Sequence, residues 1–115
     1  MGTEAVLQAI SGWFAQVKLA SLEMPRGWFG RPYDNLHQLT WSVARDHKVL
    51  LELDRQLLLV ITDPAGVEAT DTELRIERCA QVTLDWQEYG NLKPHVDDHG
   101  SGSVRFVAQG AALRQ

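Results

Sequence analysis

The sequence has few of the residues that cross-link or anchor a chain. Cys79 is the only cysteine among 115 residues, so no disulfide can form within the chain, and a structural zinc site, which usually recruits cysteine, is disfavoured. No apolar run approaches the roughly 20 residues of a membrane-spanning helix, and no charged-then-apolar signal segment opens the chain. We therefore expect a cytoplasmic protein with no membrane span and a core stabilised by apolar packing.

Clustered positive charge is also lacking. The chain has 15 acidic and 11 basic side chains, a formal net charge of −4, and no three consecutive basic residues. A phosphate backbone is recognised by a concentrated positive field, so we expect no nucleic acid partner. The dinucleotide fingerprint, the phosphate-binding loop, the serine nucleophile elbow and the His-Glu-x-x-His motif are absent as well, and we expect no cofactor.

The strongest feature that is present is the apolar run at residues 57–61, Leu-Leu-Leu-Val-Ile, with turn-forming residues on both sides. Alternate side chains of a strand point to opposite faces, so an uninterrupted apolar run predicts a strand that is covered on both faces. We expect residues 57–61 to form the central strand of a sheet.

A helical period precedes the strands. Apolar side chains recur every three or four residues between positions 3 and 23, at Val6, Ile10, Trp13, Val17 and Ala20. Pro25 and Gly27 would end such a helix. The pattern predicts an amphipathic helix over residues 3–23 that packs on the sheet.

From residue 36 the apolar period changes to two. Short turns separate the alternating stretches, which predicts an antiparallel meander of six or seven strands, and in the first of them Leu39, Trp41 and Val43 are expected to face the core. Residues 90–102 have the composition of a loop. The predicted fold class is α+β, with one domain over residues 1–115: a helix at 3–23, an aromatic loop at 25–35, a meander at 36–108 that curls or closes into a partly open barrel, and a tail at 109–115.

The aromatic loop is the first candidate site. Aromatic walls with a few convergent polar groups are typical of small-molecule pockets and of interface anchors, and an arginine can grip a carboxylate or a phosphate. The candidate binding residues in and after this loop are Trp28, Phe29, Arg31, Tyr33, Asp34 and His37. The alternative is structural: Trp28 and Phe29 plug an open end of the sheet while Arg31 pairs with Asp34.

The second candidate lies where the clearest alternating strand ends, at Trp86, Glu88 and Tyr89. Asp85 and Glu88 would serve as an acid and a base only if burial moved their pKa values apart. Asp85 falls on the polar side of the alternation, which predicts a solvated carboxylate.

A third, weaker candidate is a divalent-metal site made by His95, Asp97 and His99. A histidine spacing of four suits a helix, whereas Pro94 and Gly100 indicate a loop. A solvated loop without metal is therefore the preferred interpretation.

These features predict a non-catalytic binding or protein-interaction module, because no nucleophile is paired with a base. The alternative is a small enzyme with a pocket near Trp28 and Tyr33 that uses Arg31, Asp34, His37, Asp85 or Glu88. A conical pocket with two of these groups facing inward would favour the enzyme, and a flat aromatic patch would favour the module. The partner would be a small-molecule ligand, a basic protein that this acidic chain masks, or a second copy paired through a sheet edge as a homodimer.

Overall fold

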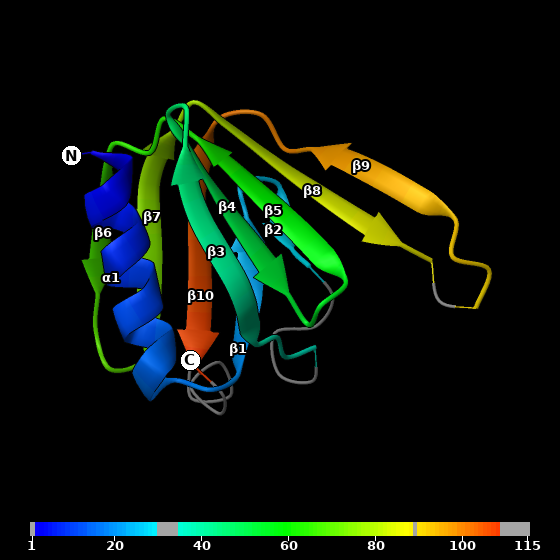
Figure 1. Ribbon diagram of the computed structural model, residues 1–115, viewed down its shortest axis with the longest axis horizontal. Coiled ribbons are helices and arrows are strands. Elements are labelled where there is room, and N and C mark those ends of the chain that lie inside the picture. Colours follow the sequence, from blue (N-terminus) through cyan, green and yellow to red (C-terminus); the bar gives the residue numbers. More distant parts are fainter. Residues whose placement is uncertain (1, 30–34, 89, 109–115) are drawn as a thin grey trace.

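The computed structural model describes residues 2–29, 35–88 and 90–108 and has an α+β fold (Figure 1). One helix, α1 (Thr3–Gln16), precedes two antiparallel sheets of five strands each. The β10 sheet contains, in spatial order, β2 (Gly27–Trp28), β1 (Ala20–Met24), β10 (Gly102–Ala108), β7 (Glu73–Cys79) and β6 (Gly66–Ala69). The β5 sheet contains β3 (Leu39–Arg45), β4 (Lys48–Leu53), β5 (Leu57–Thr62), β8 (Gln81–Gln87) and β9 (Pro94–Asp98).

The strands are antiparallel as predicted, but the prediction of a single meander or partly open barrel is wrong. The chain changes sheets after β5: the Asp63 N–H donates to the His47 carbonyl in the β5 sheet, whereas the Ala65 N–H donates to the Glu77 carbonyl in the β10 sheet. Pro64, which has no N–H, is the residue at the crossing. The chain returns to the β5 sheet at Ala80, whose N–H bonds to the Thr62 carbonyl.

One apolar core lies between the two sheets. β5 occupies the centre of its sheet, as predicted, and its side chains at 57, 59 and 61 are buried. The opposite face of β5, with Leu58 and Val60, is only half-buried. The expectation that both faces of this strand are covered is therefore wrong.

The helix ends at Gln16 rather than at residue 23, because Val17 already has an extended backbone (φ −106°, ψ 110°). Val6, Ile10 and Trp13, which the period predicted, are buried in it, and Phe14 is buried as well. Phe14 meets the Phe106 ring edge to face, with centroids 5.0 Å apart. The helix contacts β3 and β4 of one sheet and β6 and β7 of the other, so it closes the side of the core where the edge strands β3 and β6 lie (Figure 1).

Residues predicted as the end of the helix and the aromatic loop form the hairpin of β1 and β2 instead. Ala20, Leu22 and Met24 are buried at a spacing of two, and β1 pairs with β10. Gly27 has φ +130°, a conformation open to glycine, and it starts the two-residue strand β2. The predicted tail at 109–115 lies outside the described residues.

Two further strands differ from the prediction. The register of β3 shifts between Leu39 and Trp41, and this bulge turns Trp41 outward, where it is 50% exposed. Trp41 and Val43 therefore lie on the outer face, not in the core. β9 occupies part of the predicted loop at 90–102 and pairs with β8. Within the described chain, no helix has the length and apolar character of a membrane span.

Candidate functional site

The three segments singled out in the sequence converge beyond the edge strand β2. A row of four contacting rings, His37, Phe29, Trp86 and His95, joins them: the centroids are 5.5 Å apart from His37 to Phe29, 6.2 Å from Phe29 to Trp86 and 4.5 Å from Trp86 to His95. The last two rings are stacked. We call these four side chains the ring row.

The inner end of the ring row is a buried histidine and carboxylate pair. His37 is 3% exposed, and its Nδ1 lies 2.6 Å from Oδ2 of Asp54. The second carboxylate oxygen accepts the Gln38 N–H at 2.9 Å. Backbone hydrogen bonds in both directions between His37 and Ala20 fix this segment against β1. The Nε2 atom is buried without a hydrogen-bond partner among the described residues. A substrate cannot reach this ring, so the pair orients and supports the site.

The outer end of the ring row is polar and partly exposed. The Trp86 indole N–H donates to Oδ2 of Asp97 at 2.8 Å, and the His95 Nε2 is paired with the Glu88 carboxylate. Hydrogen bonds from His95 and from Asn91 lower the pKa of Glu88 below its ordinary value. Glu88 is therefore ionised near neutral pH and carries a negative charge at the margin of the site.

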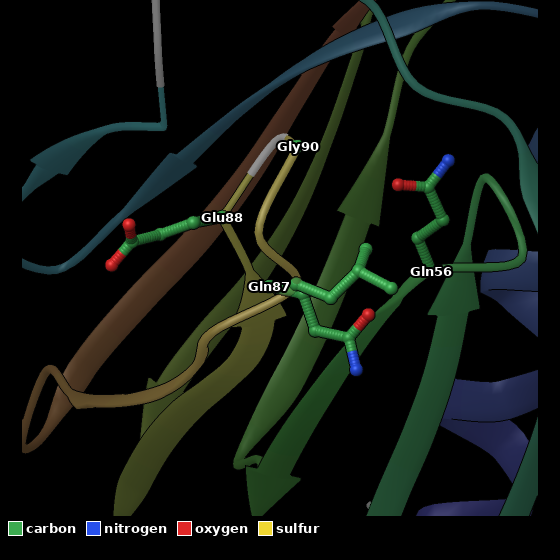
Figure 2. Close-up of a pocket in the computed structure, with 5 residues that line it drawn as sticks. Gln56, Gln87, Glu88 and Gly90 are labelled. Carbon is green, nitrogen blue, oxygen red and sulfur yellow. The ribbon is translucent and has the colours of Figure 1, made fainter.

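An open cavity of about 570 Å³ lies beside this end and is lined by Gln56, Gln87, Glu88, Gly90 and Leu92. We call it the hairpin cavity, because all but Gln56 come from the end of β8 and the turn before β9. Figure 2 shows the Gln56 and Gln87 side chains on one side and the Glu88 carboxylate pointing away from them. Leu92 is 64% exposed. The cavity thus presents two amides and one apolar side chain, with the carboxylate at its rim.

Some predicted residues do not join this site. Trp28 lies under the Arg105 guanidinium, 5.2 Å from the ring centroid, so it packs on the β10 sheet. Asp85 pairs across the ladder with Leu58 and Val96 on the outer face. It lines a smaller cavity beside Trp86 and His95 but not the hairpin cavity. Four of the predicted binding residues lie outside the described residues: Arg31, Tyr33, Asp34 and Tyr89.

The metal candidate is not assembled by the described part of the chain. No group of three or more histidine, cysteine or acidic side chains there is placed to hold an ion. His95 is paired with Glu88 and Asp97 with Trp86, and both ring nitrogens of His99 are buried without a partner in the described residues. The third candidate segment therefore contributes an aromatic contact and hydrogen bonds.

Five residues of the site were not predicted from the sequence: Asp54, Gln56, Gln87, Gly90 and Leu92. The first two belong to the turn between β4 and β5, which was recognised only as a boundary of the central strand. Leu92 carried a usable signal, because a leucine among Gly90, Asn91 and Lys93 has no core to enter.

Comparison of the chain with models of known families, with curated proteins and with solved structures finds no match. Interpretation of the site therefore depends on its own geometry. In that geometry the one thiol, Cys79, is buried in β7, away from the ring row, and burial raises its pKa to about 11. It is therefore no candidate for a nucleophile.

Proposed function

We propose that this protein is a non-catalytic interaction module that holds an extended segment of a partner protein in the hairpin cavity. The observation that supports it is the convergence of the three segments into one ring row beside an open cavity. Trp86 and His95 of the ring row line a smaller cavity that shares Gln56 and Gln87 with the hairpin cavity. Rings that stack and carry hydrogen bonds make this neighbouring support rigid, and rigidity lowers the entropy cost of binding.

The residues that line the hairpin cavity indicate what kind of peptide segment would bind there. The amides of Gln56 and Gln87 offer both donors and acceptors, which match the C=O and N–H groups of an extended backbone. The exposed Leu92 offers an apolar contact. Glu88, whose pKa is lowered by its hydrogen bonds, favours a lysine or arginine side chain at the rim. The proposed partner is therefore a basic segment, in agreement with the negative charge of the chain.

The enzyme alternative has less support. His37 is buried, so it has no access to a substrate. Asp85 lies on the outer face and does not line the hairpin cavity, whereas Glu88 lies at its rim, so the two carboxylates do not face one cavity as an acid and a base. Among the described residues the cavity itself presents one ionisable group, Glu88.

A peptide titration followed by NMR tests the proposal. Capped pentapeptides that differ only in a central Arg, Leu or Glu are added to the ¹⁵N-labelled protein. We expect the arginine peptide to shift the side-chain amides of Gln56 and Gln87 and the Trp86 indole N–H, with a dissociation constant in the millimolar range for so small a ligand. The glutamate peptide should not.

The variant Glu88→Gln should weaken arginine-peptide binding about tenfold, since it removes the one charge at the rim. Glu68→Gln, which removes an exposed carboxylate from β6 in the other sheet, should bind as the unaltered protein does. Shifts that are equal for all three peptides, or that avoid the cavity, would contradict the proposal.

A further inference from the structure

The outer face of the β5 sheet carries apolar side chains that the described part of the chain does not bury. Trp41 is 50% and Val96 69% exposed, and Val43, Leu50, Leu58 and Val60 are half-buried. These six side chains come from four of the five strands of the sheet. All but Val96 are neighbours on β3, β4 and β5, and a contiguous apolar patch of this kind marks an interaction surface.

Strand register arranges this face in three parallel rows. The first row contains two acidic residues and reads, from β3 to β9, Trp41, Glu52, Leu58, Asp85 and Val96. The middle row is mainly apolar and reads Val43, Leu50, Val60, Thr83 and Asp98. The third row contains two basic residues and reads, from β3 to β8, Arg45, Lys48, Thr62 and Gln81.

We propose that this face binds the same face of a second copy of the chain, across a two-fold axis that runs over the middle row and perpendicular to the strands. Such an axis places each strand over its own counterpart in the opposite direction. The first row of one copy then lies over the third row of the other. Leu50 and Val60 meet their own counterparts at the centre of an isologous interface.

Charge complementarity selects this axis. It places Glu52 over Lys48 of the second copy, Trp41 over Arg45 and Asp85 over Gln81, so it forms ion pairs, cation–π contacts and hydrogen bonds twice each. An axis parallel to the strands would instead place Glu52 over Asp85 at two symmetric positions, where the carboxylates would repel. The chosen axis sets one pair of carboxylates against each other, Asp98 and its own counterpart, at the β9 end of the middle row. Charged residues two rows apart on one strand are separated by about 13 Å. Lys48 therefore cannot satisfy Glu52 within its own chain.

The size of the face indicates a weak dimer. Five strands spaced about 4.8 Å apart and rows about 7 Å apart give a footprint on the order of 500 Å² per copy. This is less than the roughly 800 Å² per partner of a standard interface. We expect dissociation constants in the micromolar range or above, and sheets that pack at about 10 Å with a small twist between them.

Sedimentation equilibrium at protein concentrations from about 10 µM to about 500 µM covers the dissociation constants expected for so small an interface. The mass should rise with concentration from 12.9 kDa towards twice that value. Leu50→Lys places two ammonium groups against each other at the axis and should weaken the dimer at least tenfold. Gln8→Lys adds the same charge on the exposed side of α1 and should leave the dimer unchanged. Thermal unfolding of each variant checks that it folds.

A charge exchange tests the register independently. Lys48→Glu and Glu52→Lys should each weaken the dimer, because each places like charges in contact at two symmetric positions. The double variant should restore it. A mass that stays at 12.9 kDa throughout, a dimer that survives Leu50→Lys, as pairing through the edges of the sheets would, or a double variant that does not recover would each overturn the proposal.

Discussion

Replacing Asp54 with asparagine tests whether the buried end of the ring row is a structural support. An ionised carboxylate only accepts hydrogen bonds, so the His37 ring donates from Nδ1 to Oδ2 at 2.6 Å while the Gln38 N–H donates to Oδ1 at 2.9 Å. Asparagine keeps the size of the side chain and tolerates the positive φ of +57° at this position. Its amide, however, has one acceptor for two donors.

The loss of stability in Asp54→Asn depends on how far each of the two donors is exposed to water. Gln38 is exposed, so water can take over its N–H. His37 is 3% exposed, so the amide oxygen must turn to its Nδ1–H, and the NH₂ then faces the Gln38 N–H, donor against donor. Replacing the charge-assisted hydrogen bond by a neutral one and opposing two donors costs about 1–3 kcal/mol. A domain of this length loses roughly 4 °C of melting temperature per kcal/mol, so Asp54→Asn should melt about 4–12 °C lower.

A matched pair elsewhere in the chain provides the control. Asp63 also has a positive φ, +47°, and its Oδ1 lies 4.0 Å from Nδ1 of His47, but both side chains are exposed. Solvent screens such a pair, so Asp63→Asn should change the free energy of unfolding by less than about 0.5 kcal/mol. Urea unfolding of both variants measures the difference. Equal stabilities of the two variants would refute the assignment of a supporting role to the His37 and Asp54 pair.

Three other predictions follow from single contacts. Gly102→Ala should lower the free energy of unfolding in urea by about 2 kcal/mol or more, because φ is +141° and the new Cβ would lie 2.8 Å from Cβ of Pro25; an unchanged midpoint would contradict this. Burial raises the pKa of Cys79 from 9.0 to about 11, so a thiol reagent near neutral pH should react about 100-fold more slowly with the native protein than with the protein unfolded in urea. The free energy of unfolding should also fall as pH rises from 9.0 to about 11, because in that range only the thiol of the unfolded chain ionises. His95→Gln should raise the pKa of Glu88 towards its ordinary value, because it removes the main hydrogen bond that lowers it; a ¹³C NMR titration of the carboxyl group measures this, and an unchanged midpoint would contradict it.

The interior of the β5 sheet was predictable because burial imposes a period of two on the sequence. Val82 and Leu84 alternate with polar residues and are buried, and the same rule identified the inner side of β4. The rule assigns faces only while the register is continuous. The bulge between Leu39 and Trp41 reverses the faces of β3, and the hydrogen bond from Thr40 Oγ1 to Glu52 that accompanies it is not visible in the local sequence.

The division into two sheets depends on long-range pairing. Residues 63–66 have the composition of a hairpin turn, and the same residues serve equally well where a chain leaves one sheet for the other. The two cases differ in the hydrogen-bond partner of the Ala65 N–H. Here that partner is the carbonyl of Glu77, in the other sheet. The extent of the helix was ambiguous for a different reason. Ala20 fits both the helical spacing from Val17 and the strand spacing to Leu22.

Convergence of the candidate site depended on β9, which the sequence analysis assigned to a loop. Only the pairing of β8 with β9 stacks His95 on Trp86. The aromatic content of each segment indicated where contacts would be made, and the sheet register determined which of them meet. The contact between Asp54 and His37 also depends on the strand pairing, because 17 positions separate the two residues in the sequence.

The position of the helix connects the fold to the exposed face. A helix of 14 residues is about 21 Å long and about 10 Å wide, so it can cover one side of a core and no more. By closing the side between β3 and β6, α1 buries Trp13 and Phe14, and no other described element lies over the outer face of the β5 sheet. A helix on the outer face of this sheet would have covered Leu50 and Val60, but the sequence predicted a helix on the apolar inner face and α1 does not lie over the outer one. Because it does not, the described part of the chain leaves those side chains half-buried, which is the arrangement that the proposed dimer requires.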